Sequence, residues 1–135
     1  MKLTLSFLAL LALLPAAPLS AMSANVTVRS GETWLFAIDR GHLVKARQVH
    51  ASAKPGRSEI LVAVRAMMGT TMTITNNSPI SYTYRATLLG ARKATPARAC
   101  TLPANNRPVF EHWPQPASAV RLSNFKPAPN GGTCP

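Results

Sequence analysis

Residues 70–89 read TTMTITNNSPISYTYRATLL, and this stretch decides the fold class. Polar and apolar residues alternate on both sides of a turn-forming sequence at 76–79. The apolar positions after the turn are Ile80, Tyr82, Tyr84, Ala86 and Leu88. Alternation with a period of two, rich in Thr, Ile and Tyr, is typical of antiparallel strands with one buried face. We therefore predict a β-hairpin over 70–89, with these apolar side chains facing inward.

Similar strand patterns lie on both sides of this stretch, separated by turn sequences every eight to twelve residues or so. They cover 26–29, 34–38, 43–51, 59–66, 107–113 and 119–125. Segment 43–51 also fits a helical stripe, but its valines and the turn before it favour a strand. Residues 90–99 are predicted to form a basic loop. The expected fold is all-β, a small antiparallel β-sandwich of about seven to eight strands.

Residues 73–86, TITNNSPISYTYRA, are similar in texture to the immunoglobulin-like domains of bacterial envelopes. The resemblance covers a short part of the chain and includes no diagnostic motif. It implies a sandwich of immunoglobulin-like texture and carries over no function.

The N-terminus has the order of a secretory signal peptide. Lys2 is followed by an apolar run at 3–14 and then by small residues. The apolar run is too short for a membrane-spanning helix, which needs ~20 residues. Cleavage after Ala21 or after Ser23 fits equally well. We expect residues 1–23 to be removed, and 24–135 to form a single β domain that is exported to the periplasm or secreted.

The two cysteines, Cys100 and Cys134, both lie in the predicted exported part. In an oxidising compartment they are expected to form one disulfide. The bond would close a loop of roughly 35 residues, a constraint that stabilises the fold by about 3.5 kcal/mol. Eight of the twelve prolines lie from Pro96 onward. A disulfide there would hold a proline-rich C-terminal segment with little regular structure.

The mature chain is strongly basic. Without Lys2 it has 14 Lys and Arg against four acids, a formal charge of +10. Such a charge favours anionic partners and says nothing about the fold. The candidate residues for binding an anionic partner are Lys45, Arg47, Arg92, Lys93 and Arg98. No aromatic residues interleave the densest basic cluster, so sequence-specific nucleic-acid binding is not expected.

The sequence lacks the residues that most catalytic and metal sites require. Asp39 is the single aspartate, which leaves no acid suited to a Ser-His-Asp triad. His42 and His50 are eight residues apart, about 26 Å on a strand and about 12 Å on a helix, so they cannot share a metal ion. We expect no metal and no cofactor. One enzymatic alternative uses His112 and His50 as general acid and base, with Lys45 or Lys93 stabilising charge during phosphodiester cleavage.

The sequence PVFEHWPQP at 108–116 is interpreted as the end of a strand. Val109, Glu111 and Trp113 would share one face, with Phe110 and His112 on the other. Glu111 and His112 therefore cannot pair within the strand. The prolines that follow end it. His112 is interpreted as a packed, hydrogen-bonded side chain, and Trp113 would either fill the core or border a groove.

Three functional hypotheses remain at this level. The first is an exported, non-enzymatic β-sandwich module that binds an anionic envelope polymer or a protein partner. The alternative is a small basic secreted hydrolase acting on phosphodiesters through histidine chemistry. The third is a subunit of a larger assembly, in which a partner supplies a strand to the sheet.

Overall fold

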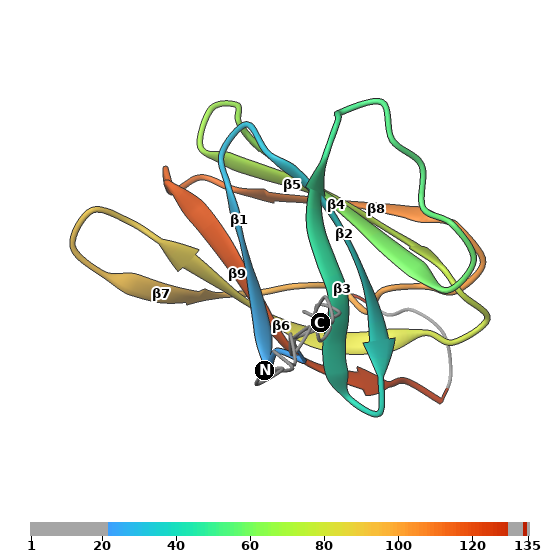
Figure 1. The fold of residues 1–135 in the computed structure, drawn as a ribbon. Coiled ribbons are helices and arrows are strands. Elements are labelled where there is room, and N and C mark those ends of the chain that lie inside the picture. Colours follow the sequence, from blue (N-terminus) through green and yellow to red (C-terminus); the bar gives the residue numbers. More distant parts are fainter. Residues whose placement is uncertain (1–21, 130–133, 135) are drawn as a thin grey trace, which may run out of the picture.

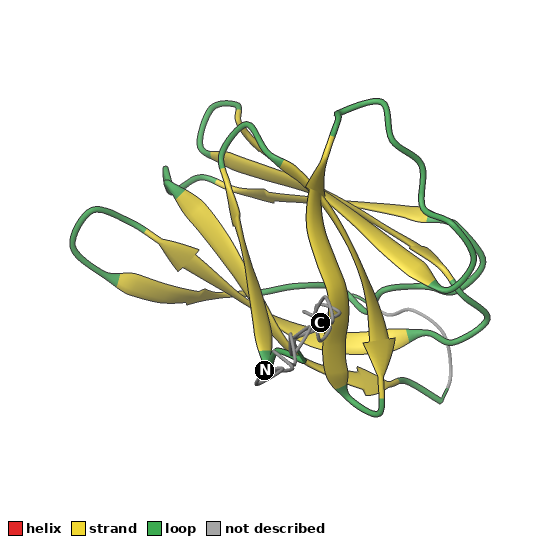
Figure 2. Ribbon diagram, in the orientation of Figure 1, coloured by secondary structure: helices red, strands yellow, loops and turns green. Residues whose placement is uncertain are grey.

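Alternating apolar residues arrange the chain as two antiparallel sheets packed face to face (Figure 1). The computed structural model describes residues 22–129 and 134. Every regular element drawn in Figure 2 is a strand. In chain order the strands are β1 (Asn25–Arg29), β2 (Thr33–Asp39), β3 (His42–Val49), β4 (Glu59–Ala66), β5 (Thr70–Asn77), β6 (Tyr82–Leu89), β7 (Ala94–Ala97), β8 (Pro108–Trp113) and β9 (Ala119–Pro127). The predicted β-sandwich is confirmed.

One sheet has the order β1-β9-β6-β7 and the other the order β3-β2-β4-β5-β8. The described residues contain no helix with the length and apolar character needed to cross a membrane. The predicted signal peptide falls almost entirely on residues 1–21, outside the described part of the chain.

The core lies between the two sheets and is filled by one face of most strands. On β4, Ile60, Val62 and Val64 are almost fully buried. Burying a large apolar side chain of this kind stabilises the fold by about 1.5–3 kcal/mol. Aromatic rings meet at the centre, where Phe125 packs edge-on against Phe36 at 5.5 Å and stacks on Tyr84 at 5.4 Å between ring centroids.

The predicted hairpin over 70–89 is wrong, because β5 and β6 belong to different sheets. β5 pairs with β4 and β8, whereas β6 pairs with β9 and β7. The chain crosses between the sheets at 78–81. Buried Asn76 holds this crossing, since its Nδ2 donates to Ile80 O at 2.6 Å and to Pro103 O at 3.3 Å. Ile80 lies in the crossing and is 45% exposed instead of facing inward.

The predicted basic loop at 90–99 is also wrong in part, because it contains β7. This four-residue strand pairs with β6 at the edge of its sheet. Pro96 breaks the usual strand composition, and an edge strand tolerates proline because one row of its N–H groups needs no ladder partner. The strand expected at 43–51 is confirmed as β3, which ends at Val49.

Candidate functional site

A groove runs along the side of the sandwich where the edge strand of one sheet meets the edge strand of the other. β1 and β3 lie next to each other there, at the front of Figure 1. Ser23, which precedes β1, and Leu43 of β3 are joined by two backbone hydrogen bonds, each of 2.9 Å. The groove has a volume of about 530 Å³, and the residues that line it include Asn25, Val26, Thr27, Trp34, Lys45 and Arg47.

A β-bulge in β3 shapes this groove. Leu35 pairs with Arg47, and Ala37 pairs with Val44. One residue of β2 therefore lies opposite two residues of β3, which is the arrangement that bends an edge strand. Lys45 is one of those two residues and has a φ of 56°. The bulge thus sets the course of β3 at the point where Lys45 lines the groove.

The two cations of the groove differ in their surroundings. Arg47 donates through Nη2 to Glu59 Oε2 at 2.8 Å and through Nη1 to Lys45 O at 3.1 Å. These bonds orient the guanidinium and compensate part of its charge. Lys45 is exposed and has no acidic group within 4.0 Å in the described residues. Lys45 therefore supplies the uncompensated positive charge of the groove.

Trp34 presents an oriented, half-buried indole to the groove. Its Nε1 donates to Glu32 Oε2 at 2.9 Å, and the Arg29 backbone N–H donates to the same oxygen at 3.1 Å. The hydrogen bond from Trp34, followed by the one from Arg29, lowers the pKa of Glu32 below its ordinary value. Glu32 is thus an anion at neutral pH that holds the indole in place.

The structure separates the predicted anion-binding residues into two groups. Lys45 and Arg47 line the groove. Arg92 and Lys93 lie in the turn between β6 and β7, and Arg98 follows β7. β7 forms the edge of its sheet opposite to β1, and Figure 1 shows it at the left of the molecule. The second basic group therefore lies away from the groove.

The two histidines proposed for phosphodiester cleavage are not brought together. His50 follows β3, and His112 lies on β8, the other edge of the five-stranded sheet. Four strand spacings of about 4.8 Å separate these edges, about 19 Å in total. His50 Nδ1 lies 2.7 Å from Ser52 Oγ, and His112 Nε2 lies 3.1 Å from Met68 O. The geometry offers no shared site for one phosphate.

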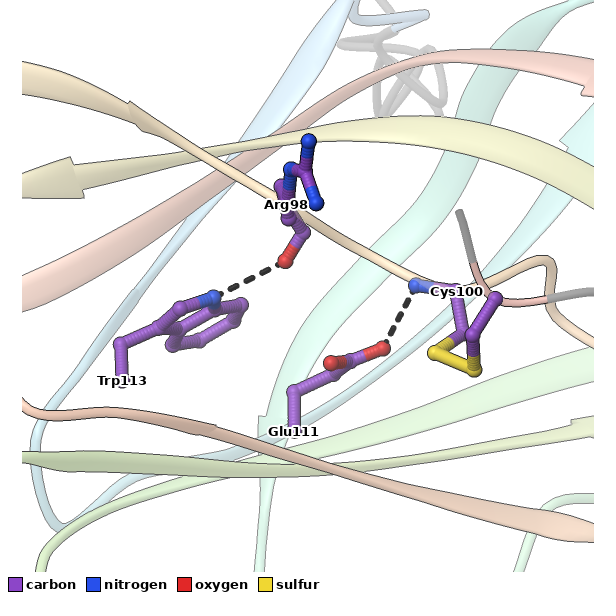
Figure 3. Close-up of a disulfide and its surroundings, with 5 residues drawn as sticks. Arg98, Cys100, Glu111 and Trp113 are labelled. Carbon is purple, nitrogen blue, oxygen red and sulfur yellow. Dashed lines mark hydrogen bonds between the residues drawn. A yellow bond between two sulfur atoms is a disulfide. The ribbon is translucent and has the colours of Figure 1, made fainter.

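Glu111 and Trp113 hold the disulfide segment against β8 (Figure 3). The Cys100 N–H donates to Glu111 Oε1 at 2.7 Å, and Trp113 Nε1 donates to Arg98 O at 2.9 Å. Both side chains lie on the same face of β8, as the alternation predicts, and the structure shows that this face is buried. Trp113 belongs to the core. His112 lies on the outer face and is exposed, so its predicted packing is wrong while its predicted hydrogen bond is present.

Tyr84 lies in the core near Glu111. Burial, followed by the negative charge of Glu111, raises the pKa of the phenol above its ordinary value. The phenol therefore stays neutral well into alkaline solution. Because it is buried, it is not a reactive group of the candidate site.

No protein family, curated protein or solved structure matches this chain. In the described residues, no three His, Cys, Asp or Glu side chains gather closely enough to hold a metal ion. The basic residues Lys45 and Arg47 could be identified as candidates from charge alone. The groove itself could not, because β1 and β3 come together only through the sheet topology.

Proposed function

We propose that the protein is an exported, non-enzymatic binding module whose β1–β3 groove holds an anionic polysaccharide of the cell envelope. One observation carries the proposal: Lys45, which has no acidic partner in the described residues, and Trp34, whose indole Glu32 orients, line the same groove. The predicted leader, the +10 charge of the mature chain and the disulfide support export to an oxidising compartment.

The groove offers each kind of contact that an acidic sugar chain needs. Lys45 and Arg47 supply positive charge for carboxylate or phosphate groups. Asn25 and Thr27 supply an amide and a hydroxyl for hydrogen bonds to sugar hydroxyls. The indole supplies a flat apolar surface, and its N–H is already bonded to Glu32. The groove lies along two strand edges, which suits an extended chain better than a compact ligand.

The test is a titration of the mature protein with polygalacturonate, a polymer of acidic sugars, followed by calorimetry. Lys45→Gln removes one charge in the groove, whereas Lys93→Gln removes the same charge at the β6–β7 turn. We expect Lys45→Gln to weaken binding about tenfold, and Lys93→Gln to change it by less than about threefold, because only near charges interact strongly in salt. Trp34 emission, isolated in a Trp113→Phe background, should change on binding.

Two outcomes would overturn the proposal. Equal losses for Lys45→Gln and Lys93→Gln would mean that the polymer binds the whole basic surface and not the groove. Binding that is unaffected by a rise in salt from 0.05 M to 0.5 M would exclude an electrostatic partner. Dextran, an uncharged polysaccharide, is the control ligand and should not bind.

A further inference from the structure

β8 forms the edge of the five-stranded sheet that lies away from the β1–β3 groove. It pairs with β5 alone, and in the described residues it makes no backbone–backbone hydrogen bond outside that ladder. An edge strand presents a row of unpaired N–H and C=O groups, which can receive a further strand. β8 therefore has the backbone groups for one more neighbour.

The other three edges of the described sheets have features that discourage strand addition. β3 contains the bulge at Lys45, β7 has only four residues and contains Pro96, and β1 lies beside β3. Bulges, lysines, prolines and short strands are the usual means of blocking an edge. β8 has an unbroken register over six residues, contains no lysine or arginine, and has its one proline at its first position. Among these edges, β8 is the one left open.

Two depressions follow this open edge. One, of about 280 Å³, is lined by residues from 107–109, from 100–103 and by Cys134. The other, of about 210 Å³, is lined by residues 111–113 and 98–100. No residue of β5 lines either of them, so both lie on the open side of β8. Figure 3 shows the two hydrogen bonds that hold the 98–100 segment beside β8. Depressions of this kind receive alternate side chains of an added strand and give such sites their specificity.

The residues around the edge indicate the chemistry of the strand that it would receive. Phe110, on the outer face of β8, is 71% exposed and presents a large apolar surface at the centre of the edge. Arg107 directly precedes β8, and Arg98 lies beside its last residue, since Arg98 O accepts from Trp113 Nε1. Both arginines are exposed and have no acidic group within 4.0 Å in the described residues. The edge therefore combines an apolar centre with an arginine near each end.

We propose that β8 is a docking edge for an extended, acidic segment of a partner protein, which joins the five-stranded sheet as a further strand. Backbone hydrogen bonds to β8 supply the affinity, and an apolar side chain packs beside Phe110. Acidic residues at the two ends of the segment complement Arg98 and Arg107. This proposal is independent of the β1–β3 groove.

A second copy of this chain fits the edge less well than an acidic segment does. The formal charge of +10 on each mature chain opposes self-association. The β8 strand of a second copy also buries Glu111 and Trp113 in its own fold, so it has no free side chains for the depressions.

The probe is a synthetic peptide with aspartates at both ends and alternating threonine and valine between them. It is titrated into the mature protein, and NMR reports the affinity and the amides that respond. We expect slower hydrogen exchange at alternate amides of β8, because only alternate N–H groups point to the open edge. Two further peptides are N-methylated at alternate amides, one along each edge. Only one of them can still pair with β8, so only one should bind; equal behaviour of the two would overturn the proposal.

Two pairs of variants locate the binding. Phe110→Ser should weaken it about tenfold, whereas Ile80→Ser, at another exposed apolar residue, should leave it unchanged. Arg107→Gln should weaken it about threefold, whereas Arg92→Gln in the β6–β7 turn should have little effect, because salt screens distant charges. Equal losses within either pair would mean that the peptide does not bind at β8. A dimer of the free protein with protected β8 amides would assign the edge to a second copy. Either result would overturn the proposal.

Discussion

The buried hydroxyl of Tyr84 has no hydrogen-bond partner among the described residues. A buried hydroxyl without a partner costs about 1–3 kcal/mol. Tyr84→Phe removes that cost and keeps the ring stacked on Phe125. We expect the free energy of unfolding at pH 7, measured in urea, to rise by about 1 kcal/mol. A fall of more than that amount would show that the hydroxyl is bonded in solution.

Tyr84 also predicts how stability depends on alkaline pH. Its pKa is raised in the folded protein, so the unfolded chain loses this proton first. The neutral phenol of Tyr84 contributes stability that is fully present below about pH 10, the ordinary phenol pKa. That contribution is lost as the pH rises through the raised pKa of the folded protein. Tyr84→Phe should therefore flatten the loss of stability above pH 10 in a urea series. It should not abolish that loss, because burial also raises the pKa of Tyr82.

At the scale of single elements, the β4–β5 turn depends on a glycine. Gly69 has a φ of +117°, and an added Cβ would lie 2.3 Å from Trp113 O. Gly31 has a similar φ of +94° but open space around it. We expect Gly31→Ala to cost about 1 kcal/mol from backbone conformation alone, and Gly69→Ala to cost about 3 kcal/mol or more because β8 must move. Equal values in urea unfolding would mean that the turn does not pack against β8.

The elements also show how far the sequence alone could predict the fold. The strand at 59–66 was predicted with its observed boundaries, because its alternation depends only on its own residues. The partners of a strand depend on residues far along the chain. Alternation followed by Asn76 and Pro79 fits both a hairpin and a crossing between sheets. Here β5 and β6 pair with strands of different sheets, and Asn76 bonds to Pro103, 27 residues away.

The same limit applies to the candidate sites. Charge identified Lys45 and Arg47, and alternation placed Glu111 and Trp113 on one shared face, without showing that this face is the buried one. The groove requires β1 beside β3, and the contact between the 67–69 turn and His112 requires β5 beside β8. Each juxtaposition joins segments distant in sequence, so no local pattern could reveal it.

At the scale of the whole molecule, the disulfide joins residue 100 to residue 134 across a separation of 34 residues. Replacing both cysteines with alanine should lower the free energy of unfolding by about 3.5 kcal/mol, since the unfolded chain regains that loop entropy. Thermal unfolding of the variant, compared with that of the disulfide-bonded wild-type protein, measures this loss. No change would mean that Glu111 and Trp113 alone hold the segment.

The pairing of β1 with β9 has a consequence for how the protein is made. The first strand finds its only described ladder partner in the last, across the 89 residues from 30 to 118. Because a chain is synthesised from its N-terminus, β1 is present long before β9 emerges. The four-stranded sheet therefore cannot close until synthesis reaches β9. Completion of this sheet therefore depends on β9, the last strand of the chain. A chain cut short before residue 119 would leave β1 without its neighbour in that sheet.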